Sequence, residues 1–291
     1  MFDLRYHVAS LIAVFAALVV GLLVGVALAS HGLGDTERKR LEEDLRSAQA
    51  QNDTLQTQLE TGESDTAFAK NAYKAVMANR LNGKKVAVLF VGSVDGATRS
   101  AVSQAITDAN GSTVRVRALK VPIDSAAVSS RLQNGRPFLA AYAGRDQLTK
   151  LGHALGQEFV AGRDTPLWGS LLNLLVEERD GTPGTPADAV VVVRTAHAQT
   201  GETALFLKGL YSGLRDVGVP AVGVAQMGGD GKSIETFKKQ QLSTVNNVNE
   251  LSGKLALAVL LSDSTVAGDF GAPPAANFLP AVPPVPTTTS G

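Results

Sequence analysis

The sequence predicts an α/β protein: an N-terminal transmembrane helix and a coiled-coil stalk, followed by a mostly parallel-sheet α/β domain and a disordered Pro-rich tail. Three observations support this prediction. The chain of 291 residues begins with a long apolar run, leucines at heptad spacing follow it, and apolar runs then alternate with helix-like segments. We place the domains at residues 1–33 (membrane anchor), 34–82 (stalk), 83–266 (α/β domain) and 267–291 (tail).

The composition excludes several classes of protein. The formal net charge is zero, so there is no electrostatic reason to expect nucleic acid as a partner. The chain has no cysteine, which excludes disulfides, thiolate metal sites and a cysteine nucleophile. At 44% hydrophobic residues the chain can bury a sizeable core, although part of this fraction lies in the opening run.

The opening run from Val8 to Ala29 contains no charged residue and predicts a membrane anchor. A helix of about 22 residues is about 33 Å long, enough to cross a hydrocarbon core of about 30 Å. Ala27-Leu28-Ala29 fits a signal-peptidase site, but the run is longer than the usual signal-peptide core. A buried core helix is usually shorter and carries a polar stripe. We therefore favour an uncleaved anchor over these two alternatives.

The charges around this run leave its orientation open. One basic residue, Arg5, precedes it, and four follow it. The positive-inside rule alone places the C-terminal side in the cytoplasm. The four basic residues alternate with acidic ones, however, and they also suit the polar face of a helix: Arg38, Lys39, Arg40 and Arg46.

Two spacing patterns predict that the chain forms a homodimer. Gly21 and Gly25 are four residues apart in the apolar run, and such a pair lets two membrane helices approach closely. The stalk carries a seam with the spacing of coiled-coil a and d positions: Leu41, Leu45, Ala48, Asn52, Leu55 and Leu59. Asn52 at an a position favours two parallel strands. A single amphipathic helix lying on its own domain is the alternative.

The predicted dimer interface consists of Gly21, Gly25, Leu41, Leu45, Asn52, Leu55 and Leu59. Gly62 occupies the next d position and ends the seam. A second helix is expected over residues 65–81, and it leads to the globular part.

The globular part shows the alternation of strands and helices that is typical of a parallel sheet with right-handed crossovers. Apolar runs predict buried strands at residues 84–92, 112–119, 187–196 and 219–225. Amphipathic or apolar segments predict helices at residues 95–111, 144–162, 166–178, 201–218 and 250–263. A polar loop is expected at residues 179–188.

The end of the chain from about Ala267 is predicted to be an extended, disordered tail. Six of the 12 prolines lie there, and the last five residues are Thr, Ser and Gly. A spacer that spans the cell wall is one interpretation, and a solvated end without a role is the other.

Motifs for catalysis or nucleotide binding are weak. Residues 226–233, QMGGDGKS, resemble a phosphate loop, but Gln226 stands where the first glycine is required, so a flexible turn is the better interpretation. The segment after the first strand lacks G-x-G-x-x-G, and we reject dinucleotide binding, although a crevice at the strand ends could hold a ligand. Ser170 is not in a nucleophile elbow. We predict a protein that is not an enzyme and has no resident cofactor.

The inventory of metal ligands is also thin. The histidines are scattered, and no pair has chelating spacing: His7, His31, His153 and His197. Met77 and Met227 are isolated, although Cu(I) prefers Cys or Met. His7 and His31 flank the apolar run, so a dimer would place two of each at its ends; side chains lying at the membrane interface are the simpler interpretation. The metal ligands therefore stay unknown.

The start of the chain, MFDLRYHVASLIAVFAALVVGLLVGVALAS with the leucine heptads directly after it, resembles a family of actinobacterial membrane proteins, the mycobacterial copper transport protein B (MctB)-like family. The segments KKVAVLFVGSVDG and LSTVNNVNELSGKLALAVLL are similar to it as well, and the resemblance covers about residues 1–271. It implies a single-pass protein of the cell membrane with a cytoplasmic N-terminus and an extracytoplasmic main domain.

The resemblance implies a role in copper homeostasis or export, with copper as a possible ligand on this ground alone. The alternative that it implies is a dimeric scaffold in cell separation and septal wall remodelling, with a membrane partner. Two departures weaken a direct copper site. The acidic signature of the family reads here as neutral Asn246, Asn247 and Asn249, and its often His-containing end reads Gly268-Asp269-Phe270-Gly271.

Overall fold

The structure is a computed structural model. It describes residues 4–28, 35–182, 184–225, 232–271, 275 and 277–283. The chain forms two compact units, Met1–Phe68 and Ala69–Gly291, and each is described by itself.

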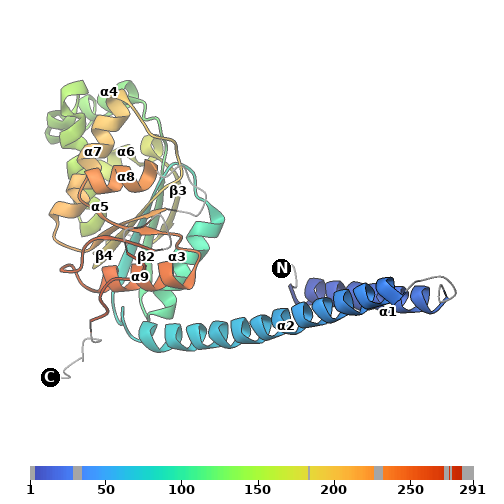
Figure 1. The fold of residues 1–291 in the computed structure, drawn as a ribbon. Helices are drawn as coiled ribbons and strands as arrows, with labels where there is room; N and C mark the ends of the chain where they lie inside the picture. The colour runs from blue at the N-terminus through green and yellow to red at the C-terminus, as the bar shows by residue number, and fades with distance from the viewer. Residues whose placement is uncertain are drawn as a thin grey trace, which may run out of the picture. The chain divides into compact units, whose positions relative to one another are not determined.

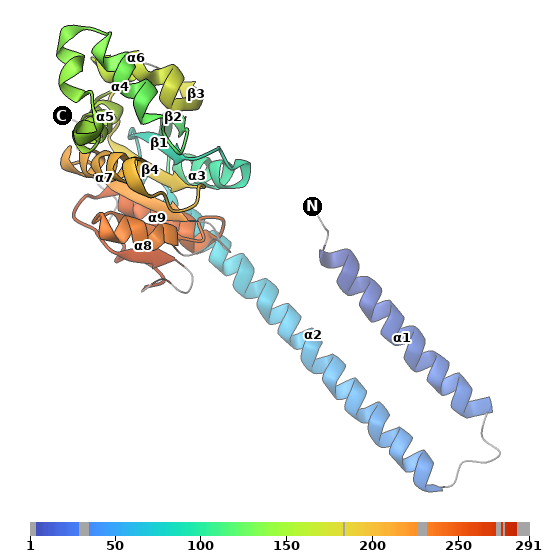
Figure 2. The same ribbon diagram turned by 90° about the horizontal axis from the view of Figure 1, so that it is seen from above.

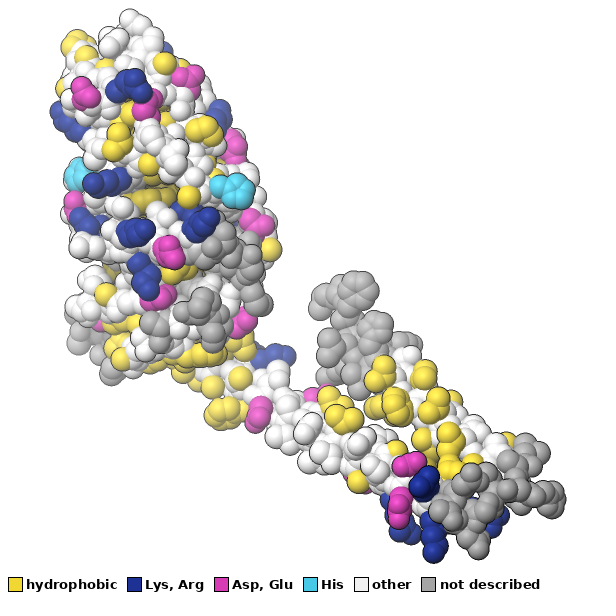
Figure 3. Space-filling model, turned by 45° about the horizontal axis from the view of Figure 1, so that its top comes forward, with side chains coloured by type: hydrophobic (Ala, Val, Ile, Leu, Met, Phe, Trp, Pro, Cys, Tyr) yellow, Lys and Arg dark blue, Asp and Glu magenta, His cyan; other side chains and the backbone are white. Residues whose placement is uncertain are grey.

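The first unit contains α1, Leu4–Leu28, which is long and apolar enough to cross a membrane over the 18 residues Ser10–Ala27 (Figure 1). None of this stretch is buried, which is incompatible with a helix of the protein core. Figure 3 shows hydrophobic side chains along the surface of this helix, whereas the visible face of the second unit carries many charged groups. The structure thus contains one candidate membrane helix among the residues that it describes.

Helix α2, Asp35–Met77, runs without a break for 43 residues, and this corrects the expectation of two helices separated at Gly62. A glycine inside a helix costs about 1 kcal/mol relative to alanine, which the strong helix formers on both sides can offset. The Thr66 hydroxyl also donates to the carbonyl of Gly62 at 2.7 Å, as four-residue spacing allows in a helix. Leu55 and Leu59 are exposed in the single chain, so the coiled coil stays a prediction.

The second unit is built on a seven-stranded sheet with the order β3-β2-β1-β4-β5-β6-β7. All neighbours pair in parallel except β2 and β3, which confirms a mostly parallel sheet. The strands are β1 Lys85–Val91, β2 Ser112–Leu119, β3 Val176–Gly181, β4 Ala189–Arg194, β5 Ala221–Ala225, β6 Ser243–Asn246 and β7 Asp269–Gly271. The four strands expected from apolar runs are β1, β2, β4 and β5.

Strand β3 corrects the prediction of a helix through Glu178 and of a loop beyond it. Helix α6, Pro166–Leu175, ends earlier, and the chain then turns into the antiparallel edge strand β3. Only Val176 of this strand is buried. An edge strand exposes most of its side chains, so the charged sequence VEERDG carries no apolar alternation that could have revealed it.

Strand β7 corrects the predicted start of the tail at residue 267. Residues 269–271 extend the sheet beside β6, and Phe270 forms a further bridge with Asn277. The Asp269 carboxylate accepts from the Thr244 hydroxyl at 2.8 Å and pairs with Lys238 at 3.1 Å, which attaches β7 to β6 and to α8, Lys232–Lys239. Residues from 284 onward lie outside the described part of the chain.

Helices cover both faces of the sheet (Figures 1 and 2). The C-terminal end of α2 packs on one face with α3, Gly96–Asp108, and α9, Leu251–Ser262. The other face carries α6 together with α4 Ser125–Gln133, α5 Leu148–Ala161, α7 Gly201–Asp216 and α8 Lys232–Lys239. Short 3-10 segments lie at Pro137–Tyr142 and Arg145–Gln147.

Strand β1 shows how the sheet serves two cores. Val86, Val88 and Phe90 belong to the core on the α3 and α9 side. Ala87, Leu89 and Val91 belong to the core on the α5 and α7 side. Successive side chains of a strand point to opposite faces, so a strand between two helical layers is apolar throughout.

Helices α5 and α7 touch through glycines. Gly152 and Gly156 lie on α5, and Gly209 and Gly213 lie on α7. A Cβ atom added at Gly209 would be 2.0 Å from the carbonyl oxygen of Thr149, and one added at Gly152 would be 2.1 Å from that of Phe206. The two backbones are therefore in direct contact, and no side chain fits between them.

Candidate functional site at the carboxyl edge of the sheet

The order of the parallel strands places a topological switch point between β1 and β4. From β1 the chain continues outward to β2, whereas β4 leads in the opposite direction to β5, β6 and β7. Open α/β sheets bind ligands in the crevice at the carboxyl ends of the strands where this reversal occurs. The loops that follow Val91 and Arg194 form this crevice, so the expected position of a site is defined by the topology.

The two loops meet closely at Gly92. Its φ of 104° is unfavourable for other residues, and an added Cβ would be 2.7 Å from the Thr195 hydroxyl and 2.8 Å from the amide nitrogen of Ala196. The amides of Thr195 and Ala196 both donate to the carbonyl of Val91, and the Thr195 hydroxyl donates to that of Ser93 at 2.7 Å. These contacts make a fixed floor for the crevice.

A hollow of about 310 Å³ lies above this floor. Its walls come from the ends of β1, β2 and β4 and from the start of β3: Gly92, Ser93, Leu119, Lys120, Val121, Pro122, Glu177, Thr195 and Ala196. Four of these residues carry polar side chains, namely an ammonium, a carboxylate and two hydroxyls. This volume is at the small end of the range for ligand sites.

The segment that follows β2 forms one wall of the hollow, and hydrogen bonds hold it to two helices. Lys120 donates through its amide to Leu175 at 2.8 Å and through its ammonium to the carbonyl of Asn173 at 3.0 Å. The amide of Ile123 donates to the hydroxyl of the buried Thr203 on α7 at 3.1 Å. The segment between Lys120 and Ile123 is thus tied to α6 and to α7.

Glu177 reaches the hollow through an irregularity in β3. Leu119 pairs with Val176, but the preceding Ala118 pairs with Glu178, so Glu177 is the extra residue of a β-bulge. Bulges redirect side chains and are common beside functional sites. Within the part of the chain that the structure describes, the Glu177 carboxylate has neither a hydrogen-bond partner nor an ion-pair partner.

The N-terminus of α3, which follows β1, is already occupied by a carboxylate. Asp95 accepts from the amide of Thr98 at 2.7 Å and from its hydroxyl at 2.6 Å. Dinucleotides place their pyrophosphate at this helix end, where Asp95 already accepts the amide of Thr98. The geometry therefore supports the rejection of dinucleotide binding.

Two arginines of β2, the buried Arg115 and the partly buried Arg117, have structural partners. Arg115 donates to the carbonyls of Phe159 and Thr185. The guanidinium of Arg117 lies 4.3 Å from the centre of the Trp168 ring, and burial lowers the pKa of Arg117 to about 10. These contacts bind β2 to α5 and α6 and thereby support the wall of the hollow.

The residues predicted to form a dimer interface lie in the first unit, whereas the hollow belongs to the second. Gly21 and Gly25 are on α1, where an added Cβ meets no atom within 4 Å. The remaining members, Leu41, Leu45, Asn52, Leu55 and Leu59, are on α2. Whether these faces pair with a second copy stays a prediction.

The described histidines do not come together. His153 on α5 contacts Asp216 of α7 at 3.1 Å, and His197 is exposed after β4. The side chain of His7, all of His31, and the phosphate-loop-like residues up to Gly231 lie outside the described residues; Lys232 and Ser233 begin α8. In the described ranges no three His, Cys, Asp or Glu side chains converge as ligands of a metal.

The positions that correspond to the acidic signature and to the often His-containing end of the family have structural roles. Asn246 ends β6, and the buried Asn247 adopts a φ of 54° and accepts the amide of Glu250 at 3.0 Å before α9. Asp269 is held by Thr244 and Lys238. Met77, a soft donor, is fully buried in the core. This donor set does not fit a copper site.

Comparison with family models decides the relationship. A model described as copper transport outer membrane protein, MctB, matches residues 1–280. The chain belongs to the MctB family. The match to MctB includes α1, α2 and all seven strands of the sheet, so it unites the apolar helix and the α/β unit in one family. A search of curated proteins found no match.

Sequence reasoning missed most of the hollow. The crevice at the strand ends was expected from the strand–helix alternation, but Lys120 and Glu177 carried no signal. The sequence pattern predicts a helix at Glu177, and only the register of β2 against β3 reveals that Glu177 is the extra residue of a bulge. This register depends on pairing between residues nearly 60 positions apart, so the sequence of either strand alone does not predict it.

Proposed function

We propose that this chain is a membrane-anchored protein of the cell envelope that takes part in copper homeostasis or export. One observation carries the proposal: the match to the MctB family over residues 1–280, a family described by copper transport. The match favours the copper-related role over the scaffold in cell separation.

Helix α1 supports the anchor in this proposal. Leu11, Phe15 and Leu18 each expose more than half of their surface, and no part of Ser10–Ala27 is buried. Such an apolar surface is stable in a bilayer rather than in water. We propose a cytoplasmic N-terminus and an α/β unit on the outer side of the cell membrane, as the family resemblance implies.

A reporter that is active only outside the cytoplasm, fused after Gly62, tests this orientation. We expect activity from the full-length anchor and none from a variant that lacks residues 8–29. An active cytoplasmic reporter fused at the same residue would contradict the orientation while leaving the anchor itself intact.

Copper is the cargo in this proposal and not a resident cofactor. The described donor groups are occupied elsewhere: His153 contacts Asp216, and Met77 is packed in the core. We therefore assign no step of transport to a copper ligand of the α/β unit.

The decisive experiment is a strain that lacks this chain, examined for copper tolerance and for septum morphology. We expect copper sensitivity, restored by the wild-type chain and equally by a His153→Ala/His197→Ala variant. Normal copper tolerance combined with unseparated cells would overturn the copper role in favour of the scaffold. Failure of the double variant alone would show that these two histidines act on copper.

We also propose that α2 pairs with a second copy of itself. Leu55 and Leu59 expose 58% and 48% of their surface on a helix of 43 residues. An isolated polar helix is marginally stable in water, and most helices depend on packing of an apolar face. The a and d spacing of the exposed leucines supports a parallel coil as the source of that packing.

A further inference from the structure

We propose that the hollow at the carboxyl ends of β1, β2 and β4 binds a small zwitterion, a free amino acid or a short peptide, by its ammonium and its carboxylate. This inference goes beyond the copper role and does not depend on it. Four polar side chains line the hollow, and together they offer a carboxylate, an ammonium and two hydroxyls to a ligand.

Glu177 provides the subsite for a cation. Its carboxylate faces the hollow from the bulge of β3, and no group in the described chain neutralises it. A carboxylate accepts hydrogen bonds and donates none, so it recognises an ammonium group. A metal ion is a poor alternative, because among the described residues no further carboxylate or histidine joins Glu177 in a group of three.

Thr195 adds a second acceptor. Its hydroxyl proton is committed to the carbonyl of Ser93 at 2.7 Å, so only its oxygen lone pairs remain for a ligand. The hydrogen bond also fixes the rotamer of this side chain. An ammonium group can thus donate to Glu177 and to Thr195.

Lys120 provides the subsite for a carboxylate. One of its three ammonium protons goes to the carbonyl of Asn173, and two remain. The hydroxyl of Ser93 has no partner among the described residues and is a further donor at the floor of the hollow. No ion pair joins Lys120 and Glu177, so the two opposite charges are both available to one ligand.

The surroundings limit the class of ligand. The volume of about 310 Å³ is at the small end of the range for ligand sites, which suits a small molecule. Lys120 and Glu177 are both exposed, so water competes for each charge. We therefore expect a dissociation constant of about 10 µM to 1 mM for a good ligand.

Equilibrium dialysis of the full chain in detergent micelles tests the proposal, with radiolabelled L-alanine and L-alanyl-L-alanine as probes. We expect saturable binding of at least one probe at one site per chain. Propanoate lacks the ammonium and ethylamine lacks the carboxylate, so each should bind at least about tenfold more weakly than alanine. The two probes distinguish a free amino acid from a peptide.

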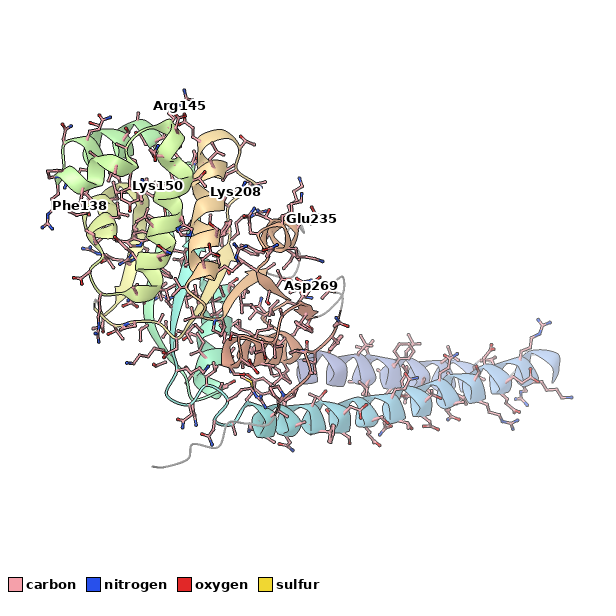
Figure 4. All side chains as sticks on the ribbon, turned by 90° about the vertical axis from the view of Figure 1, so that its left-hand side faces the viewer. Phe138, Arg145, Lys150, Lys208, Glu235 and Asp269 are labelled. Atoms are coloured by element: carbon pink, nitrogen blue, oxygen red, sulfur yellow. The ribbon has the colours of Figure 1, made fainter. Side chains whose placement is uncertain are left out.

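Two variants locate the site. Glu177→Gln and Lys120→Gln should each weaken binding of the zwitterion about tenfold or more. Glu177→Gln should also remove the preference for alanine over propanoate, a result that a merely structural role would not produce. The matched controls are Glu235→Gln on α8 and Lys208→Gln on α7, whose side chains are labelled in Figure 4, and both should bind as the wild type does.

Three results would overturn the proposal: no saturable binding of either probe, equal binding of alanine and propanoate by the wild type, or unchanged binding by both site variants. Glu177 has no partner among the described residues, so its replacement leaves the fold intact, and an unchanged Tm confirms that a loss of binding is local. The copper phenotype is measured separately, so failure here leaves the proposed function unaffected.

Discussion

Glycines four residues apart occur in two regions of this chain, and their surroundings differ completely. On α1, a Cβ added at Gly21 or Gly25 would meet no atom within 4 Å. On α7, a Cβ added at Gly209 or Gly213 would lie 2.0 Å from a carbonyl oxygen of α5. The glycine face of α7 is thus covered by a neighbouring helix, whereas the glycine face of α1 is uncovered.

Glycines at this spacing mark a helix face without side chains, but the spacing alone does not identify what covers that face. In the α/β unit, the covering helix belongs to the same chain, because the loops and the sheet bring α5 and α7 together. In the first unit, the structure describes no helix against this face, so a second copy remains the natural candidate. Substitutions that fill each face can separate these cases.

The largest effect is expected where backbones touch. A Gly209→Ala/Gly213→Ala variant should lose about 2–6 kcal/mol of the free energy of unfolding, because each overpacked site costs about 1–3 kcal/mol. At about 2–4 °C per kcal/mol, the Tm should fall by about 4 °C or more. Thermal unfolding of the full chain, followed by circular dichroism, measures this.

The matched control is Gly169→Ala on α6, where an added Cβ meets nothing within 4 Å. It should leave the Tm unchanged or raise it slightly, since alanine favours a helix by up to about 1 kcal/mol over glycine. If the control lowered the Tm as much as the α7 variant does, close contact of α5 and α7 would not be the cause.

The exposed leucines of α2 provide the second test. A Leu55→Ser/Leu59→Ser variant should weaken dimerisation of the full chain about a hundredfold or more, because burying one leucine contributes about 1.5–3 kcal/mol. Sedimentation in detergent at micromolar concentration measures the change. The control replaces outward-facing positions of the same heptads, Ala50→Ser and Thr57→Ser, and should leave a dimer. A monomeric wild type would contradict the proposed pairing of α2 in a coiled-coil stalk.

The sequence predicts the interior of this fold better than its edges. The run of valines in β4 is buried on both faces, and such a run is typical of a central parallel strand. Strand β6 has four residues and β7 has three, so neither is long enough to show a pattern. Both belong to the sheet because of what packs beside them.

The residues of the candidate site also differ in how far the sequence predicts their positions. Gly92 follows a recognisable strand, and strand–helix alternation predicts a crevice at its end. Glu177, by contrast, is placed by a bulge against β2, and Lys120 by a contact with Asn173. These placements depend on pairing between distant segments, which a local pattern does not encode.

The glycines of α1 give a smaller predicted effect than the leucines of α2. A Gly21→Ile/Gly25→Ile variant should weaken the dimer by about 1–2 kcal/mol, or about tenfold, without changing the Tm of the α/β unit. Val19→Ile/Leu23→Ile has the same spacing on the opposite helix face and should not affect the dimer. If both double variants weakened the dimer equally, the glycine face of α1 would not be the dimer contact. A second copy would then not explain the contrast with α7.

The smallest effect is expected from the ion pair at the rim of the α5–α7 contact. Arg215 and then His153 hold the pKa of the Asp216 carboxyl below its ordinary value by hydrogen bonds. A carboxyl whose pKa is lowered by folding stabilises the folded state above its ordinary pKa of 3.8, and this stabilisation is lost as the pH falls through the lower folded value.

Asp216→Asn should therefore lower the Tm slightly at pH 7 and cease to differ from the wild type in strong acid. Thermal unfolding of the full chain between pH 2 and pH 7, a range that extends about two units below and about three units above the ordinary pKa of Asp, measures this. The effect should be small, because water screens the charges of an exposed ion pair. A loss comparable to that of the Gly209→Ala/Gly213→Ala variant would mean that charge, and not backbone contact, joins α5 to α7.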